Sequence, residues 1–258
     1  PGLPAGYDWR PARLDDAAGL SALFRVVDEA ERLEEVLGPE VVRRELTLRG
    51  VDPARDTLIA LTEDGGIRGF AWVWTKRTEE AARAIVWIEA HPEHLPPEPH
   101  LLAWIEAAAR PMLGPPGDPG RRYLRQHIEE HRTRRRRVAE EAGYRHLRTF
   151  VEMWRTLTDD LPTAGPLPPG VEAVAWCPDL VEAARQAANE SFASHWDSMP
   201  VEPQDWQARV CDDPHFRPDL SRLALSDGRV VALCLASVDR EHNAREGGAE
   251  VWLGRIGT

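Results

Sequence analysis

Two segments of the chain, about 165 residues apart, share one hydrophobic pattern. The first holds the apolar run Leu58–Leu61 and the second holds Leu223–Leu225, and an Asp-Gly pair follows each run. A second apolar run comes after each turn, at Ile67–Thr75 and Val230–Asp239. Apolar runs joined by a short Asp-Gly turn are typical of β-hairpins. The pattern therefore predicts one hairpin in each half of the chain.

The match extends to both sides of these hairpins. Upstream, each half has an amphipathic helical pattern that opens near an Asp, and then a second helix. Downstream, a polar turn leads to one more strand. The matched pairs are 15–27 and 179–188, 39–48 and 203–210, 76–83 and 240–248, and 86–88 and 251–253. Five matched elements at a nearly constant offset favour duplication of one unit over chance.

The first half continues beyond its matched part. The pattern predicts a helix at 101–112, a strand at 123–128, a helix at 132–142 that ends at Gly143, and a last strand at 150–157. We therefore expect a first domain at 7–157, a proline-rich linker at 158–170, and a second domain at 171–258 that stops after its fourth strand. The expected fold class is α/β (α+β), with two tandem domains, each a mixed, largely antiparallel sheet flanked by helices, the second incomplete.

Composition narrows the classes of function. A net charge of −11 repels phosphate backbones, so we expect no nucleic-acid partner. The apolar runs are too short for a membrane span, and the start lacks the pattern of a signal peptide. The three cysteines form no CxxC pair, which favours reduced thiols and a cytoplasmic location. Lys76 is the only lysine, a usage typical of a GC-rich bacterial genome.

Two local motifs suggest other chemistry. His127–His131 has the H-x-x-E-H form of inverted zinc proteases. The stretch begins in a predicted strand, so its histidines should not converge on a metal, and we expect none. Arg132–Arg137 is the one concentrated basic run, but no aromatic residues interleave with it and Glu140 and Glu141 follow. A solvated helix face is the simpler interpretation of this run.

Four stretches resemble the GNAT acyltransferase superfamily, and the tandem arrangement is similar to double-domain enzymes of the mycothiol synthase type. Asp8–Ala17 is similar to the first strand and helix start of many members, and Trp87–His94 to the fourth strand and the turn after it. Glu140–Tyr144, followed by Val151–Trp154, resembles the closing helix and last strand. Asn189–Trp196 is similar to the part that lines the acceptor site in double-domain members.

The resemblance implies an N-acetyltransferase that moves an acetyl group from acetyl-CoA to a primary amine of a small molecule. In such enzymes a splayed fourth strand offers backbone N–H groups to the pantetheine arm, and a glycine-rich loop before the next helix holds the pyrophosphate. A base removes the amine proton. The resemblance implies no metal, and a homodimer is left open.

The first domain departs from this pattern. Its loop position, His94–His100, has three prolines and no glycine, and each proline removes an N–H donor for phosphate. Glu98 adds a negative charge that would repel the phosphates, and Ala139 stands where the family usually has a tyrosine. We therefore expect this domain to be a structural or regulatory one, without catalysis.

The second domain is the better catalytic candidate, with its glycine-rich loop expected after Thr258. Alternation along 250–258 puts Glu250, Trp252, Gly254, Ile256 and Thr258 on one face. Ile256 and Thr258 would contact the pantetheine arm, and Glu250 would accept the amine proton, unless it is only a solvated strand end. His195, Trp196 and Asp197 are candidates for acceptor contact. The alternative function is a non-catalytic double domain that binds a ligand or a protein.

Overall fold

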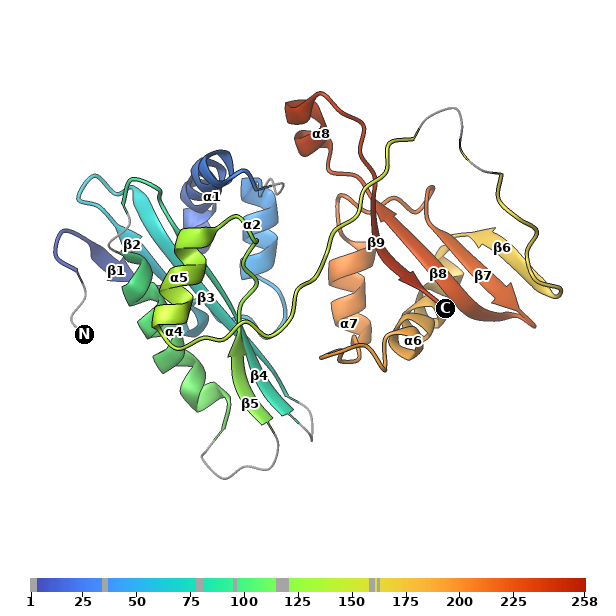
Figure 1. Ribbon diagram of the computed structural model, residues 1–258, viewed down its shortest axis with the longest axis horizontal. Helices are drawn as coiled ribbons and strands as arrows, with labels where there is room; N and C mark the ends of the chain where they lie inside the picture. The colour runs from blue at the N-terminus through green and yellow to red at the C-terminus, as the bar shows by residue number, and fades with distance from the viewer. Residues whose placement is uncertain are drawn as a thin grey trace. The chain divides into compact units, whose positions relative to one another are not determined.

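The computed structural model describes residues 4–33, 37–77, 81–94, 97–114, 121–157, 161 and 163–258. The chain divides into two compact units, Pro1–Arg148 and Thr149–Thr258, called unit 1 and unit 2 below (Figure 1). Cys177, Cys211 and Cys234 are free thiols, as expected. Among the described helices, none has the length and apolar content that crossing a bilayer requires.

Unit 1 is a five-stranded sheet with strand order β1-β2-β3-β4-β5. Neighbouring strands are antiparallel except β4 and β5, which are parallel. The strands are β1 (Asp8–Arg10), β2 (Thr57–Leu61), β3 (Ile67–Arg77), β4 (Ala81–Ala90) and β5 (Arg121–Arg125). The helices are α1 (Ala17–Glu31), α2 (Pro39–Leu46), α3 (Pro53–Asp56), α4 (Pro97–Met112) and α5 (Thr133–Glu141).

Each face of this sheet has its own core. Side chains of α1 and α2 pack on one face around Phe70 and Trp72, and side chains of α4 pack on the other around Val73 and Ile88. Alternation along the strands produces this division, because successive side chains of a strand point to opposite faces.

Unit 2 is a four-stranded antiparallel sheet with strand order β6-β7-β8-β9. The strands are β6 (Val171–Ala175), β7 (Arg222–Ser226), β8 (Arg229–Ser237) and β9 (Trp252–Gly257). The helices are α6 (Val181–Ser191), α7 (Pro203–Trp206), which continues as a π-helical turn to Cys211, and α8 (Arg240–Glu246). Helices α6 and α7 pack on one face of the sheet, where Trp206, Leu223 and Leu233 form the core.

The two sheets agree in detail where the sequence pattern matches. Both predicted hairpins form, as β2–β3 and β7–β8, and each contains a break in register at the same place, between Ala60 and Leu61 and between Ala224 and Leu225. A β-bulge is a specific local feature. Its presence in both hairpins supports the duplication hypothesis. The expected domain boundaries stay predictions.

Four predicted elements differ from the structure. The turn expected at 76–83 is shorter, because β3 runs to Arg77 and β4 begins at Ala81. Residues 150–157 are not a strand: within the described residues no strand pairs with them, and Val151, Met153 and Trp154 are 77%, 90% and 88% exposed. High β propensity yields a strand only where a partner strand supplies backbone hydrogen bonds. The polar turn expected at 240–248 contains α8, which Asp239 caps by accepting a hydrogen bond from the His242 N–H. Strand β5 ends at Arg125, short of the predicted Ile128.

The end of α5 follows the prediction closely. Gly143 has φ of +91°, which favours glycine, and lies just after the helix. The Gly143 N–H donates to the Glu140 carbonyl and the Tyr144 N–H to the Ala139 carbonyl. These two bonds form a Schellman motif, so the chain leaves α5 in a fixed direction.

Gly69→Ala tests the close packing of α4 on β3. A Cβ at Gly69 would lie 2.9 Å from Leu101 Cδ1 and 3.2 Å from Pro97 Cβ, both of which are buried. We expect a loss of unfolding free energy of about 1–3 kcal/mol from overpacking, measured by chemical denaturation. Gly165→Ala is the control, because a Cβ there meets no atom within 4 Å. Equal stability of the two variants would contradict this packing.

Candidate active site

Strands β4 and β5 pair only over part of their length. Ala81–Ile85 lies beside Arg121–Arg125, and β4 then continues to Ala90 without β5. The chain from β5 returns to the sheet through α5. In the GNAT resemblance this opening between the two strands is where a pantetheine arm would enter, so its contents decide whether unit 1 can hold acetyl-CoA.

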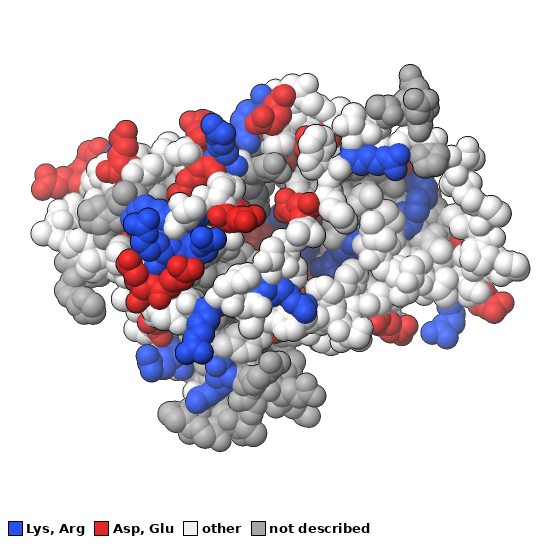
Figure 2. Space-filling model, in the orientation of Figure 1, with Lys and Arg blue, Asp and Glu red and all other residues white. Residues whose placement is uncertain are grey.

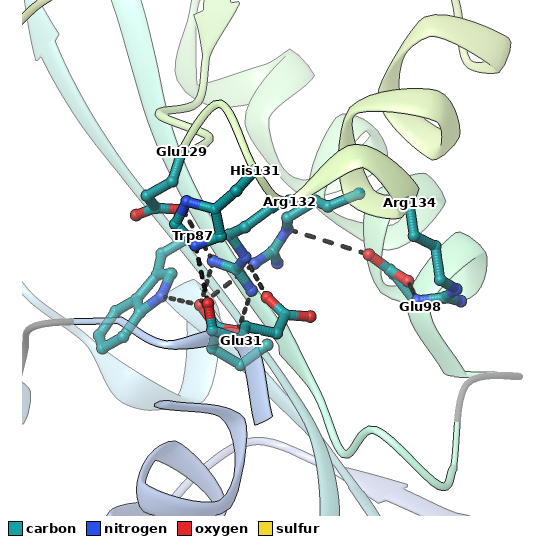
Figure 3. Close-up of polar contacts among 9 residues, drawn as sticks. Glu31, Trp87, Glu98, Glu129, His131, Arg132 and Arg134 are labelled. Carbon is teal, nitrogen blue, oxygen red and sulfur yellow. Dashed lines mark hydrogen bonds and ion pairs between the residues drawn. The ribbon is translucent and has the colours of Figure 1, made fainter. Parts of the chain in front are cut away.

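A buried ionic network fills this opening, and its centre is Glu89 on β4. Figure 3 shows the network and labels Trp87 and Arg132, two of the partners of Glu89. Glu89 is 3% exposed. Its carboxylate accepts hydrogen bonds from Arg132 Nη2 at 2.8 Å, from Arg135 Nη1 at 3.1 Å and from Trp87 Nε1 at 2.8 Å. Arg132 also forms ion pairs with Glu31, at the end of α1, and with Glu129 at 3.2 Å.

Glu89 is therefore unsuited to accept a proton. Burial raises the pKa of its carboxyl, but the charges of Arg135 and Arg132, with the hydrogen bonds from Arg132 and Trp87, outweigh burial, and the net pKa is lowered. A carboxylate whose oxygens are occupied by three donors is held in its charged form. Glu89 stabilises unit 1 and does not act as a base.

A second acidic side chain occupies the start of α4. Glu98 is 4% exposed and forms ion pairs with Arg134 and, at 3.9 Å, with Arg135 Nε. The start of a helix attracts anions such as phosphate, and here the protein's own carboxylate lies in that place. Pro97 and Pro99 contribute no N–H donors. Leu95 and Pro96, of the same predicted loop, lie outside the described residues.

Little space remains between β4, α4 and α5. The cavity there measures about 10 Å³, room for a single water molecule, and Ile88, Glu98 and Arg135 are among the side chains that line it. Ala139 lines it too and is 4% exposed. As these described side chains lie, this cavity has no room for a pantetheine arm.

The arginine run 132–137 is not the solvated helix face that the sequence favoured. Arg132 and Arg135 are buried and form ion pairs with Glu89, while the exposed Arg136 lies 3.7 Å from Glu140. Figure 2 shows acidic and basic side chains intermixed over the part of unit 1 that carries α5. Arg132 and Arg135 are three residues apart at the start of a helix. This spacing in the sequence indicates that the two arginines share one helix face.

The H-x-x-E-H stretch forms a loop and a turn before α5 and does not begin in a strand as predicted, because β5 ends at Arg125; His131 Nε2 lies 2.7 Å from the Glu31 carbonyl oxygen. Among the described residues, no group of three or more His, Cys, Asp or Glu side chains is arranged to hold a metal ion.

In unit 2, β9 has a bulge that the alternation did not predict. Leu235 lies opposite Arg255 and Ala236 opposite Leu253, so Gly254 is the extra residue. Trp252 lies opposite Ser237 and Ile256 opposite Cys234, on alternate faces of β8. The prediction that Trp252 and Ile256 share a face with Gly254 is therefore wrong, because a bulge inverts the alternation beyond it.

The predicted cofactor contacts lie at the end of β9. Ile256 is 59% exposed, and Thr258 is exposed just after the strand. Gly257 lies between them and is buried, and a Cβ there would lie 2.8 Å from the Ser191 Cβ of α6. Among the described residues β9 pairs with β8 alone.

Glu250, the predicted base, precedes β9 and is held by α8. Asn243 accepts a hydrogen bond from the Glu250 N–H at 3.0 Å and donates one to its carbonyl oxygen at 3.0 Å. The Glu250 carboxylate is 55% exposed and lies 3.5 Å from His242 Nε2, whose side chain is 5% exposed. Sequence reasoning missed His242 and Asn243, because it assigned 240–248 to a turn.

The three predicted acceptor contacts lie in the loop after α6. His195 is exposed, while Trp196 and Asp197 are half-buried. Phe150 lies beside the first two, with ring centroids 6.5 Å from His195 and 6.2 Å from Trp196. Asp197 has φ of +57°. That this loop and Glu250 act on the same acceptor stays a prediction.

No protein-family model and no curated protein sequence matches the chain. Among solved structures, the whole chain is similar to a GCN5-related N-acetyltransferase from Sphaerobacter thermophilus, with 23% identity, a TM-score of 0.70 and 77% of that chain covered. Partial matches include an aminoglycoside acetyltransferase from an uncultured soil metagenomic sample, solved with sisomicin (11% identity, TM-score 0.43, 61% of this chain and 100% of that one). Another is a Trypanosoma brucei acetyltransferase (13% identity, TM-score 0.43, 58% and 99%). The first match shows that the chain has the GNAT fold, which confirms the predicted fold class.

Glu89→Gln tests the buried network. The substitution removes the buried carboxylate that Arg132 and Arg135 share, although each keeps an ion pair with another glutamate, and we expect a loss of about 3 kcal/mol of unfolding free energy at neutral pH. Because the folded-state pKa of Glu89 is lowered, its contribution is complete above the unfolded-state pKa of about 4.3 and is lost as pH falls below it. The difference between wild type and variant should therefore shrink in acid.

The measurement is denaturant unfolding at a series of pH values. Glu40→Gln is the control, because Glu40 pairs with Arg43 while its side chain is 86% exposed. This variant should have nearly the unfolding free energy of the wild type. A Glu89→Gln variant as stable as the control would contradict the network's role.

Proposed function

We propose that the protein is an N-acetyltransferase that transfers an acetyl group from acetyl-CoA to a primary amine of a small molecule, and that unit 2 carries the reaction. The observation that supports this most directly is the contrast between the two sheets. In unit 1 the side chains of Glu89, Glu98 and Arg135 fill the opening beside β4. In unit 2 the corresponding strand, β9, has a bulge at Gly254, and just before it the Glu250 carboxylate lies 3.5 Å from His242 Nε2 and stays 55% exposed.

The proposed step is direct attack of a neutral amine on the thioester carbonyl. The new C–N bond forms, the C–S bond breaks, and CoA leaves as a thiolate that takes up a proton. Backbone groups of β9 near Ile256 and Thr258 would contact the pantetheine arm. Glu250 would accept the amine proton, directly or through water.

The surroundings of Glu250 support this role. Asn243 fixes the main chain of Glu250 through two hydrogen bonds, and the carboxylate stays 55% exposed. His242 Nε2, 3.5 Å from that carboxylate, is placed to orient it or to share the proton. Unit 1 would then support unit 2 without binding cofactor.

The second candidate is a non-catalytic double domain that binds a small ligand or a protein. The exposed apolar residues Val151, Met153 and Trp154 favour it, because exposed apolar segments mark sites of interaction. Calorimetric titration of acetyl-CoA distinguishes the two. Saturable binding supports the transferase. Absence of binding, both for this chain and for any longer form of the protein that continues past Thr258, would remove the transferase proposal.

Glu250→Gln tests the base. The amide keeps the size of the side chain, and the Asn243 bonds to the main chain remain, so acetyl-CoA binding should be unchanged. We expect kcat to fall by roughly 10²–10⁴-fold, the usual contribution of a general base. The readout is release of the CoA thiol in the presence of a panel of primary amines.

Glu246→Gln is the matched control, since Glu246 lies on α8 with a side chain 53% exposed and paired with Arg245. It should retain full activity. If Glu250→Gln were as active as this control, Glu250 would be only a solvated strand end.

A further inference from the structure

The loop between α6 and α7 of unit 2 takes the place of the last helical turn of α1 in unit 1. Helix α1 has 15 residues and α6 has 11, whereas Pro39 of α2 and Pro203 of α7 follow the first residues of these helices at the same spacing. The chain therefore leaves the helix about one turn earlier in unit 2, and residues 192–202 form a loop. The predicted acceptor contacts His195, Trp196 and Asp197 all lie in this loop.

The far end of this loop is held on α6 by Asn189. The Asn189 side chain accepts a hydrogen bond from the Val201 N–H at 2.8 Å and donates one to the Val201 carbonyl oxygen at 3.2 Å. Arg185 Nη1 donates another bond to the same carbonyl oxygen at 2.6 Å, and Glu182 fixes the Arg185 guanidinium through two hydrogen bonds. The Val201 side chain packs against the core of unit 2. Residue 201 is thus tied to the helix from which the loop departs, the arrangement of an Ω-loop.

The near end of the loop lies against the end of β9. A Cβ at Gly257 would lie 3.3 Å from Cε2 of Phe192, the first residue of the loop. In unit 1 the last turn of α1 is likewise connected to the fourth strand, because Glu31 pairs with Arg132, which pairs with Glu89 on β4. The proposed function assigns the fourth strand of unit 2 to acetyl-CoA, so a loop that begins beside this strand is placed to hold the amine.

Hydrogen bonds inside the loop fix its conformation. The His195 N–H donates to the Phe192 carbonyl oxygen and the Ser198 N–H donates to the His195 carbonyl oxygen, each at 3.0 Å. The rings of Phe192 and His195 lie edge to face, with centroids 6.0 Å apart. Asp197 has φ of +57°, a conformation that residues other than glycine keep only where their surroundings hold them. The loop is therefore ordered without a ligand.

We infer that Asn189, supported by Arg185, is a positioning residue that holds loop 192–201 in the form that binds the acceptor amine. A loop fixed before binding loses less conformational entropy when its ligand arrives, so the ligand is bound more tightly. Asn189 acts on the amine through the main chain of Val201, at the far end of the loop. The inference rests on the proposed function for the identity of the ligand as an acceptor amine.

Hydrogen exchange of backbone amides tests the hold on the loop. Asn189→Ala removes the hydrogen-bond acceptor of the Val201 N–H and one donor to the Val201 carbonyl oxygen. We expect exchange of the Val201 amide to become about tenfold faster or more, while that of Ala188, in the interior of α6, stays unchanged. Gln186→Ala is the matched control, because Gln186 is exposed on the same helix and its side-chain amide donates to Glu182. Equal exchange at Val201 in the two variants would overturn the inference.

Binding of amines tests the consequence for the acceptor. The probes are phenethylamine, butylamine and spermidine, and the readout is the indole N–H resonance of Trp196 in a ¹H–¹⁵N spectrum, assigned with Trp196→Phe. We expect a saturable shift with at least one amine in the wild-type protein, and a Kd about tenfold higher in Asn189→Ala. Gln186→Ala should keep the wild-type Kd. An unchanged Kd in Asn189→Ala, or no saturable shift with any of these amines, would overturn the inference.

Asn189→Asp separates positioning from a general loss of stability. Its carboxylate keeps a hydrogen-bond acceptor for the Val201 N–H, and Arg185 still donates to the carbonyl oxygen, so most of the amine affinity should return. A Kd as high in Asn189→Asp as in Asn189→Ala would contradict the inference. If Asn189→Ala does not unfold cooperatively, Arg185→Gln replaces it, because it also removes a donor to the Val201 carbonyl oxygen.

The kinetic signature of positioning is a higher KM for the amine, with kcat and the KM for acetyl-CoA unchanged. A fall in kcat with the amine KM unchanged would contradict the inference. Calorimetric titration of acetyl-CoA tests the proposed function separately. Amine binding that depends on Asn189, in a protein that does not bind acetyl-CoA, would support the role of the loop while the transferase proposal fails.

Discussion

Removal of the Glu89 carboxylate from water is the constraint on which unit 1 depends. A charge 3% exposed is tolerated only with charged partners, and Arg132 and Arg135 supply them from the start of α5. Their position fixes α5 across the opening beside β4, and Arg134 and Arg135 in turn hold Glu98 at the start of α4. The groups that stabilise unit 1 are therefore the same groups that fill its opening.

Unit 2 has the same strand order through its first four strands but a different chemistry at the matched position. There Gly254 forms a bulge, and Arg255, opposite Leu235, lies over the Trp206 ring, where unit 1 has Glu89 opposite Phe70. Helix α8, between β8 and β9, brings His242 and Asn243 to Glu250. The two sheets thus carry different sets of polar side chains along their fourth strands.

The sequence was sufficient for the parts of the fold that depend on local pattern. The two hairpins, the helix 133–141 and its Gly143 end followed from periodicity and turn chemistry. The strand expected at 150–157 does not form, because no described strand pairs with its apolar residues. A local sequence pattern does not show whether such a partner strand exists. The bulge at Gly254 and the burial of Arg132 and Arg135 also depend on tertiary pairing, so the faces of β9 and the role of the arginine run were predicted wrongly. Ile256, Thr258, His195, Trp196 and Asp197 stay predictions as site residues.

Hydrogen–deuterium exchange with and without acetyl-CoA is the most direct test of this account. The account predicts that acetyl-CoA slows exchange of the backbone amides of β9 and of the residues just before it, and leaves those of β4, the start of α4 and α5 unchanged. Slower exchange at β4 and α4, with β9 unaffected, would show that the network around Glu89 opens to admit the cofactor, and would contradict the division of roles between the two units.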